Sequence, residues 1–281
     1  MTTLIMGGVA YDPKVVTIWE GFRRWLRDQG FDFDFLLYSH YERQVDDLVA
    51  GHIHAAWNSP LAWIRSERLA AARGRRVASA VMRDTDQDLT SVIVVRADSP
   101  ARTVADLAGG TVAVGAVDSP QSTLIPLSFL RGEGLRDVAV RRFDVGVGLH
   151  GDHIGGERDA ARALVAGEVD AACMIDGNHL LFGQEGTLPA GATRVLAQTP
   201  VFDHCTMAIV DTAPRDEAAE FVRLLESMSY ADPEVRPLLD LEGLKQWVPG
   251  RTSGFGPLNR AVDEVGFYDA DGGVTAAEYR P

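Results

Sequence analysis

The segment Asp118-Ser-Pro-Gln-Ser-Thr123 carries the residue types that hold a small anion at the start of a helix. With Ser122 as the N-cap, the hydroxyls of Ser122 and Thr123 stand beside backbone N–H groups that have no partner inside a helix. The helix dipole adds about half a positive charge at that end. Ser119, Gln121, Ser122 and Thr123 are therefore predicted to hold a phosphate, phosphonate, sulfonate or carboxylate group. A plain helix cap is the other interpretation of the same residues.

Further candidate ligand-binding residues lie just after predicted strands or at the start of a predicted helix. Aromatic rings can stack on a planar or apolar part of a ligand, amides and hydroxyls can donate hydrogen bonds, and a guanidinium can pair with an anion through two N–H groups. Core packing for the tryptophan, a helix start for the Ser-Pro pair and a solvated arginine are the alternatives. The candidates are Tyr11, Trp57, Asn58, Ser59, Arg158 and Asp176.

Cysteine and histidine residues raise the possibility of catalysis. Cys205 follows His204, and His179 lies in another predicted loop. If the chain is an enzyme, these three residues are the first to test, with Asp176 and Arg158 beside them. Neighbouring residues in a strand point to opposite faces, so a Cys205 nucleophile is expected to need a base from elsewhere. His204 is also a candidate ligand-binding residue. No metal-ligand spacing or cofactor fingerprint is present, so neither a metal nor a cofactor is predicted.

Composition limits the partners. The 281 residues include 27 Lys and Arg against 40 Asp and Glu, a net charge of −13 that repels nucleic acid and argues against it as a partner. A small anion must therefore be bound by a local group of donors. No apolar run approaches the roughly 20 residues of a membrane span. The N-terminus resembles a first strand and not a signal peptide, which predicts a cytoplasmic location, or a periplasmic one if an export signal was removed.

The elements that position these residues alternate between strand and helix. Two nonapeptides, 48–56 (LVAGHIHAA) and 164–172 (LVAGEVDAA), are nearly identical, and each is predicted to join a helix through glycine to a buried strand. Coincidence is one explanation, since such joints use few residue types. The other is that two lobes share one β/α architecture with a cleft between them. Ligands of open α/β sheets sit at the carboxyl ends of strands beside such a crevice.

These segments resemble the phosphonate-type family of extracytoplasmic substrate-binding proteins. The family's Asp-x-x-Ser-Thr turn resembles 118–123, with one extra residue here. Residues 41–57, 91–100, 107–112 and 159–176 resemble other parts of the family, with His54 where an Asp is usual. The resemblance implies an α/β fold of the type II periplasmic-binding-protein class, in which each lobe is a mixed sheet flanked by helices. We expect lobe 1 to comprise 1–97 and 204–281 and lobe 2 to comprise 98–203, with two hinge crossings near 96–99 and 200–204.

Two departures from the family keep the function open. Glu157-Arg158 replaces the family's usual Ser-His pair, and an export signal is not evident. The first hypothesis is a binding protein whose lobes close on a small oxyanion, with an ABC permease or another protein as partner. The alternative is a cytoplasmic lyase, decarboxylase or hydrolase of the same fold that acts on a small organic acid. A cytoplasmic sensor that presents its closed form to a partner is a third hypothesis.

Overall fold

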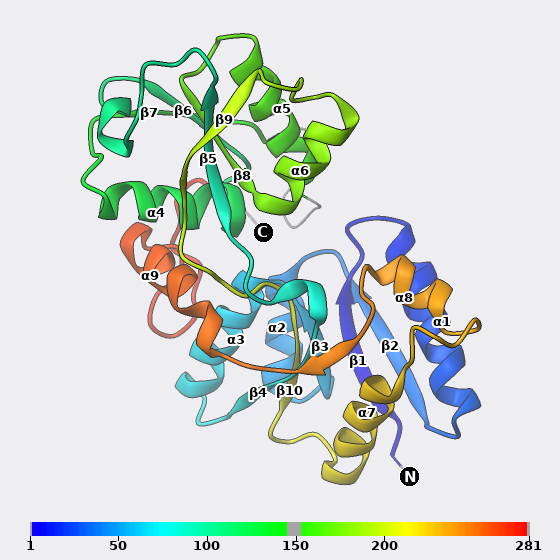
Figure 1. Cartoon of the computed structure of the whole chain (residues 1–281). Coiled ribbons are helices and arrows are strands. Elements are labelled where there is room, and N and C mark those ends of the chain that lie inside the picture. Colours follow the sequence, from blue (N-terminus) through cyan, green and yellow to red (C-terminus); the bar gives the residue numbers. More distant parts are fainter. Residues whose placement is uncertain (1, 145–152, 280–281) are drawn as a thin grey trace.

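The computed structural model describes residues 2–144 and 153–279, and it folds into two α/β lobes that lie one above the other (Figure 1). The strands are β1 (Leu4–Val9), β2 (Phe33–Tyr38), β3 (Ala55–Asn58), β4 (Val77–Arg83), β5 (Ser91–Arg96), β6 (Thr111–Val114), β7 (Ala139–Arg142), β8 (Ala171–Ile175), β9 (Thr193–Gln198), β10 (Thr206–Val210) and β11 (Trp247–Pro249). The α-helices are α1 (Lys14–Asp28), α2 (Tyr41–Ala50), α3 (Pro60–Ala72), α4 (Ile125–Gly132), α5 (Ile154–Val165), α6 (Asp176–Glu185), α7 (Arg215–Ser227), α8 (Arg236–Glu242) and α9 (Gly256–Val265).

Each lobe is built on one mixed sheet, which confirms the predicted fold class. The first sheet has the order β11-β4-β10-β3-β1-β2, and the second has the order β7-β6-β8-β5-β9. β1, β2 and β3 are parallel, as are β6, β7 and β8, whereas β10 and β5 run antiparallel to their neighbours. The order β2-β1-β3-β10-β4 therefore repeats as β7-β6-β8-β5-β9. In each sheet the antiparallel strand β10 or β5 is the first that the chain enters after it crosses from the other lobe.

The two nonapeptides occupy equivalent places in this repeat. The first joins α2 to β3 and the second joins α5 to β8, the third strand of each sheet. Gly51 and Gly167 follow the two helices with φ of 80° and 74°, in the left-handed region where a side chain is strained. The prediction that the two lobes share one architecture is therefore confirmed.

The first hinge crossing lies earlier than expected. β5 pairs with β8 and β9 in the second sheet, so residues 91–96 are part of lobe 2 and the expected boundary at residue 97 is wrong. The two crossing segments instead meet at Leu89 and Phe202, which exchange backbone hydrogen bonds of 2.9 and 2.8 Å. The sequence misled because β5 is as apolar as the lobe 1 strands before it, and an apolar run does not reveal which sheet it joins.

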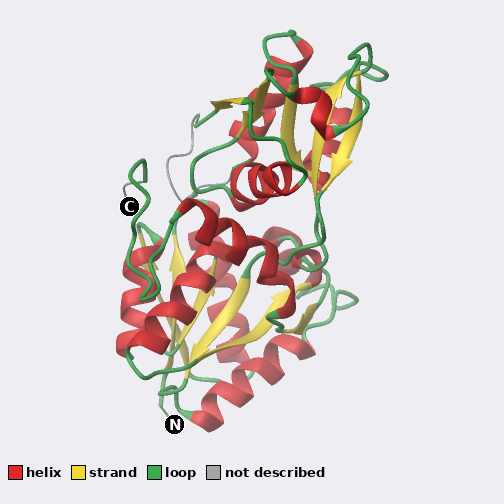
Figure 2. Ribbon diagram, turned by 90° about the vertical axis from the view of Figure 1, so that its left-hand side faces the viewer, coloured by secondary structure: helices red, strands yellow, loops and turns green. Residues whose placement is uncertain are grey.

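Helices pack on the sheets of both lobes (Figure 2). Buried apolar side chains form the cores between these layers. In α1, the residues Val15, Ile18, Trp19, Phe22 and Leu26 follow helical spacing and bury one face against the first sheet with α7 and α8. The other face packs on α2, α3 and the C-terminal part of the chain. Among the described residues, no helix is both long and apolar enough to cross a membrane.

The last part of the chain bridges the two lobes. We call residues 256–279 the C-terminal segment; it contains α9. Leu258, Ala261 and Phe267 from this segment share a core with Leu61 of lobe 1 and with Leu124 of lobe 2. Arg131 of α4 pairs with Glu264 of α9 at 2.9 Å. The C-terminal segment therefore reaches the gap between the lobes.

Candidate ligand cleft

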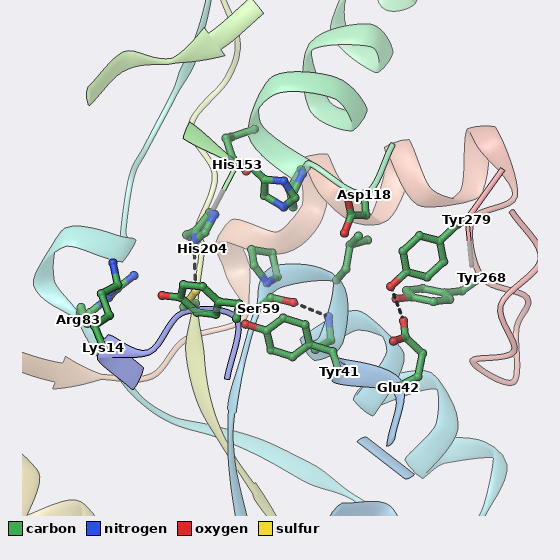
Figure 3. Close-up of a pocket in the computed structure, with 17 residues that line it drawn as sticks. Lys14, Tyr41, Glu42, Ser59, Arg83, Asp118, His153, His204, Tyr268 and Tyr279 are labelled. Atoms are coloured by element: carbon green, nitrogen blue, oxygen red, sulfur yellow. Dashed lines mark hydrogen bonds between the residues drawn. The ribbon is translucent and has the colours of Figure 1, made fainter. Parts of the chain in front are cut away.

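A cleft of about 260 Å³ lies between the two lobes. That volume is slightly below the roughly 300–1,000 Å³ of drug-sized ligand sites, so the cleft fits a small molecule. Lobe 1, lobe 2, the second crossing and the C-terminal segment all contribute to its wall (Figure 3). Its lining residues are Tyr11, Lys14, Tyr41, Glu42, Ser59, Pro60, Leu61, Ala62, Arg83, Asp118, Pro120, Gln121, His153, His204, Cys205, Tyr268 and Tyr279.

Most of these side chains stand at the carboxyl ends of strands. Lys14 begins α1 after β1, Tyr41 begins α2 after β2, and Ser59 caps α3 after β3 by accepting the amide of Ala62 at 3.3 Å. Arg83 is the last residue of β4. Because parallel strands end at the same edge of a sheet, the repeated β/α joints bring these side chains together.

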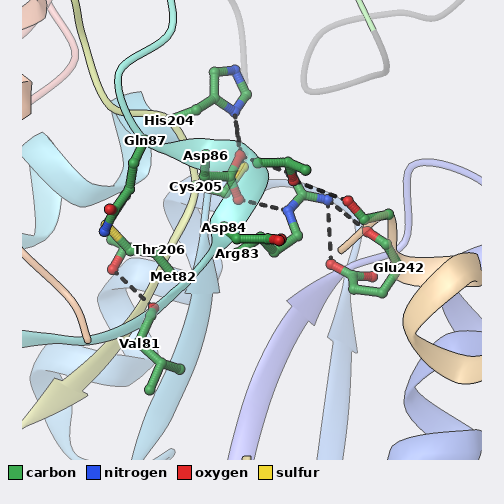
Figure 4. A network of polar contacts seen from close by, with 12 residues as sticks. Val81, Met82, Arg83, Asp84, Asp86, Gln87, His204, Cys205, Thr206 and Glu242 are labelled. Carbon is green, nitrogen blue, oxygen red and sulfur yellow. Dashed lines mark hydrogen bonds and ion pairs between the residues drawn. The ribbon is translucent and has the colours of Figure 1, made fainter. Parts of the chain in front are cut away.

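Arg83 is the most strongly held cation of the cleft (Figure 4). Its Nε and Nη2 atoms donate to Asp86 at 2.5 and 2.9 Å, and Nη1 donates to the carbonyl of Glu242 at 2.8 Å. The guanidinium lies 5.4 Å from the centre of the Trp57 ring, and this cation–π contact also helps to hold it in place. A guanidinium has five N–H donors, so these three bonds leave donors for a ligand.

The electrostatics of this network keep His204 charged. Burial by itself would raise the pKa of Asp86, but Arg83 and His204 outweigh it and lower that pKa to about 2. Burial would likewise lower the pKa of His204, but Cys205 and the Asp86 carboxylate raise it to about 10. Glu242, behind Arg83, has a pKa raised to about 7 by burial, against the effect of Arg83. Arg83 and His204 are therefore protonated at neutral pH within one network that also contains Asp86 and Cys205, and Lys14 lies at the same end of the cleft.

His204 and Cys205 do contact one another, contrary to the sequence-based expectation. They precede β10, so the alternation of a strand does not apply, and Nδ1 of His204 lies 3.2 Å from Sγ of Cys205. The same Nδ1 atom also faces Asp86 at 3.6 Å. In a nucleophilic triad the base uses one ring nitrogen for the nucleophile and the other for the acid. Here the thiol and the carboxylate share one nitrogen, so this arrangement is not a Cys-His-Asp relay.

The Asp86, His204 and Cys205 side chains also place three possible metal-ligand atoms within 4.8 Å of one another. These three residues have no recognised metal-ligand spacing in the sequence, so the group becomes visible only in the fold. Both oxygens of Asp86 already accept hydrogen bonds from Arg83. A metal ion at that carboxylate would lie against the guanidinium, so these residues fit a metal poorly.

Behind the cleft wall, lobe 2 holds a buried acid. Glu157 of α5 accepts the amide of Ile175 at 3.0 Å and the side chain of Asn178 at 2.9 Å. Burial raises its pKa to about 7, although hydrogen bonds from Asn178, Ile175 and the Gln121 side chain oppose the rise. Since a carboxylate accepts, this contact uses the NH₂ group of Gln121 and turns its amide oxygen elsewhere. That oxygen is buried and has no hydrogen-bond partner among the described residues.

The structure places four of the sequence-predicted ligand-binding residues on the wall of the cleft. They are Tyr11, Ser59, Gln121 and His204. Their contact with a ligand stays a prediction.

The predicted anion cradle is arranged differently from the expectation. The N-cap is Ser119, not Ser122: its hydroxyl accepts the amide of Ser122 at 3.2 Å, and its carbonyl accepts the amides of Thr123 and Leu124 at 3.2 and 3.0 Å. The Ser119 and Ser122 hydroxyls bond to each other at 2.6 Å and both residues are fully buried. The amides that were expected to bind a ligand are therefore satisfied by Ser119. Thr123 borders another cavity, of about 300 Å³, against the C-terminal segment.

The remaining predicted residues do not reach the wall of the cleft. Asn58 is buried between Gln44 and Ser66, with hydrogen bonds of 2.9 and 3.0 Å. Trp57 packs edge-on against Trp247, below Arg83. Core packing therefore accounts for both positions.

On the lobe 2 side, Asp176 accepts the Thr90 hydroxyl at 2.8 Å. His179 lies on α6 and is not among the residues that line the cleft, whereas Cys205 is. Arg158 pairs with Glu185 at 2.7 Å and lies over Phe182. Successive helix residues differ by 100°, so Glu157 faces the sheet while Arg158 faces α6.

Sequence reasoning did not assign several residues of the wall to the ligand. Lys14, Tyr41, Glu42 and Arg83 follow or end strands β1, β2 and β4, so the same strand-end rule that selected Tyr11 could have found them. Tyr268 and Tyr279 carry no local signal, because they come from the C-terminal segment and reach the cleft only through tertiary packing.

The family whose sequence profile matches this chain is described as the periplasmic phosphonate substrate-binding protein of ABC transporters, and the match spans residues 9–255. The chain belongs to this family. The family is periplasmic, which supports the exported location rather than the cytoplasmic one that the N-terminus predicted. No curated protein matches the sequence.

Solved structures share the fold at low sequence identity. PhnD1 of Prochlorococcus marinus, in complex with methylphosphonate, has 13% identity and a TM-score of 0.67, over 94% of this chain and 98% of that one. A Xanthomonas citri protein bound to ATP has 15% identity and a TM-score of 0.69, over 94% and 100%. The aliphatic sulphonate binding protein SsuA of Escherichia coli has 19% identity and a TM-score of 0.54, over 94% and 83%. These structural similarities show that this chain has the same two-lobed fold as the three binding proteins.

Proposed function

We propose that the chain is the substrate-binding component of an ABC transporter and closes its two lobes on a small oxyanion of the phosphonate or sulfonate type. The single observation that carries the proposal is the group of cations Lys14, Arg83 and His204 at one end of the cleft. A chain with a net charge of −13 has a repulsive field for anions, so such a cluster is a specific local feature. Family membership and the fold support the same function.

The oxyanion would be held mainly by hydrogen bonds from charged donors. Arg83 retains N–H donors after its bonds to Asp86 and Glu242, and Nε2 of His204 is the ring nitrogen that its contacts with Cys205 and Asp86 leave for a ligand. Hydrogen bonds to charged groups contribute about 1.5–3 kcal/mol each. Because His204 lies on the second crossing and Arg83 on lobe 1, a shared anion would stabilise one arrangement of the two.

The partner and location follow from the same proposal. A binding protein of this family would act in the periplasm and deliver its ligand to a membrane permease. The enzyme alternative gains no support from the site, because Cys205 and Asp86 compete for one nitrogen of His204 and His179 lies elsewhere.

Isothermal titration calorimetry with methylphosphonate, ethanesulfonate and phosphate tests the proposal, with the neutral dimethyl ester of methylphosphonate as control. We expect at least one oxyanion to bind one-to-one and to be recovered unchanged, while the ester does not bind. Absence of binding to every oxyanion contradicts the proposal, and recovery of a converted ligand supports the enzyme.

A further inference from the structure

The C-terminal segment is held firmly by lobe 1. Arg68 of α3 pairs with Asp263 at 2.7 Å and donates to the carbonyl of Tyr268 at 3.1 Å. Arg65, also of α3, is 8% exposed and donates to the carbonyl of Gly272 at 2.9 Å. Breaking such bonds is unfavourable, because a buried donor would be left without an acceptor. The segment is therefore bound to lobe 1 as part of that lobe.

The contacts of the same segment with lobe 2 are of another kind. Arg131 at the end of α4 pairs with Glu264 at 2.9 Å, and Arg142 at the end of β7 pairs with Glu278. Both arginine side chains are 35% exposed, so water can replace their partners. Leu124 adds an apolar contact, but a cavity of about 300 Å³ occupies part of this boundary. Packed atoms are missing there, so the lobe 2 side is the one that can separate.

The hinge and the C-terminal segment stand at opposite ends of the cleft. Figure 3 shows His204, which lies on the second crossing, at one end, and Tyr268 and Tyr279 of the C-terminal segment at the other. When two lobes rotate about a hinge, the displacement grows with the distance from the hinge. Opening of the cleft therefore moves lobe 2 away from the C-terminal segment and separates the ion pairs of Arg131 and Arg142.

We propose that the C-terminal segment is a latch that favours the closed arrangement of the lobes without any ligand. Lobe 1 holds the segment, and Arg131 and Arg142 of lobe 2 bind it when the lobes are together. Because the two ion pairs form only in that arrangement, they stabilise it against the open one. The segment lies outside the residues 9–255 that match the family, and the latch goes beyond the proposed function because it acts on the unliganded protein.

The latch sets how often the unliganded cleft is closed. Loss of both ion pairs should lower the ratio of closed to open protein by about two- to thirtyfold, given the usual contribution of exposed pairs. A ligand that needs closed lobes binds with an affinity reduced by the fraction of protein that is closed. The latch therefore changes the affinity for every cleft ligand by one factor, whatever the chemistry of the ligand.

The thiol of Cys205 reports opening, because it lines the cleft while Cys173 is buried. Without ligand, the double variant Arg131→Gln with Arg142→Gln should react with iodoacetamide about two- to thirtyfold faster at Cys205 than the unchanged protein does. Small-angle X-ray scattering should give the variant a larger radius of gyration. The melting temperature shows that the variant is folded, which is expected because both arginines are at the surface.

The matched control removes the same two charges from lobe 2 without touching the latch. Arg141 pairs with Glu168 at 2.8 Å and Arg162 pairs with Asp159 at 2.9 Å, and all four residues belong to lobe 2. The double variant Arg141→Gln with Arg162→Gln should keep the alkylation rate and the radius of gyration of the unchanged protein. Equal alkylation rates in the two double variants would overturn the latch.

Exchange of the charges tests one pair directly. Arg131→Glu alone places two acids together and should speed the alkylation of Cys205, whereas Arg131→Glu combined with Glu264→Arg should restore the original rate. Failure of the second substitution to slow the reaction would show that this pair does not hold the lobes together, and it would overturn the latch at Arg131. These measurements use no ligand, so the proposed function stands or falls separately, by calorimetry.

Discussion

His54 and Asp170 make the same hydrogen bond in the two lobes. Nδ1 of His54 accepts the amide of Ile5 in β1 at 3.0 Å, and Oδ2 of Asp170 accepts the amide of Thr111 in β6 at 2.8 Å. The two residues occupy the same place in the repeated nonapeptides, and β1 and β6 are the equivalent strands of the two sheets. A histidine can replace the acid because its neutral ring offers one acceptor nitrogen.

This bond makes lobe 1 sensitive to acid. Burial lowers the pKa of His54 below its ordinary value, although Glu217 opposes the shift, so the folded state favours the neutral ring. A group whose pKa is lowered on folding contributes stability above its unfolded pKa of about 6.5 and loses it as the pH falls through the folded value. His54→Asp, with a carboxylate acceptor, should lose less melting temperature between pH 7.5 and pH 5.5 than the unchanged protein. Differential scanning fluorimetry measures both.

His52→Gln is the control for the His54 prediction, because His52 belongs to the same nonapeptide but is exposed and faces Asp47. It should leave the acid sensitivity unchanged. An equal loss of melting temperature in His54→Asp and in the unchanged protein would show that the His54 bond does not set the response to pH.

Gly254 lies against the clamp that ties the two crossing segments together. Arg251 donates to both oxygens of Asp203 at 2.6 and 2.7 Å and to Asp88 at 2.7 Å, and a Cβ atom on Gly254 would lie 2.0 Å from the Asp203 carboxyl carbon. Gly254→Ala should therefore cost about 1–3 kcal/mol of unfolding free energy, the usual cost of forcing atoms into a packed site.

The matched control for the clamp is Gly256→Ala, two residues further on. A Cβ atom there meets nothing within 4 Å, and φ is −54°. It should be neutral or stabilise by up to about 1 kcal/mol. Urea unfolding of both variants measures the difference, and equal stability of the two would refute the clamp.

The sequence contains two lysines, which gives a clean test of the cationic end. Lys14 is exposed at the cleft and Lys245 lies elsewhere, over Tyr230. Lys14→Gln should weaken oxyanion binding by about two- to fivefold, because an exposed ion pair contributes about 0.2–1 kcal/mol. Lys245→Gln makes the same change in net charge and should bind as the unchanged protein does. If the two variants weaken oxyanion binding equally, the effect comes from the net charge of the protein and not from Lys14 at the cleft.

Arg83→Lys keeps the charge but loses the planar fork that holds Asp86 and faces the cleft. Oxyanion affinity should fall by roughly ten- to a hundredfold, which corresponds to the 1.5–3 kcal/mol of one charged hydrogen bond. The melting temperature without ligand shows whether the fold has survived. A folded Arg83→Lys protein with unchanged affinity would remove Arg83 from the site.

More of the fold than of the ligand site could be predicted from the sequence. The repeated joints at Gly51 and Gly167 fixed the equivalence of the lobes, because a helix end, a glycine and a buried strand are local features. The site depends on which hydrogen bonds form. Ser119, three residues before Ser122, takes the amides that an anion would have needed, and spacing alone could not show which serine is the cap.

Tertiary packing accounts for the other misses. Arg83 is held in place by Asp86 and by the carbonyl of Glu242, which is about 160 residues away in sequence. Tyr279, near the end of the chain, donates a hydrogen bond to Glu42. No local pattern in the sequence predicts contacts between residues so far apart along the chain. Trp57 and Asn58 showed the opposite error, since they stand at a strand end but point into the core.

Cys205 offers a chemical probe of closure, because it lines the cleft while Cys173 is buried in lobe 2. Bound oxyanion should slow alkylation of Cys205 by iodoacetamide by tenfold or more, since ligand and closed lobes cover the thiol. Peptide mass spectrometry measures the modification, and Cys205→Ser identifies any background. Alkylation that proceeds at the same rate with saturating ligand would mean that the ligand binds elsewhere.

A crystal structure with the tightest-binding phosphonate or sulfonate would show where the oxyanion binds. We expect the oxyanion to lie between the lobes, with oxygens about 2.7–3.2 Å from nitrogens of Arg83 and His204. An oxyanion found outside this cleft, or bound beside Ser122 and Thr123 with no contact to Arg83 or His204, would contradict it.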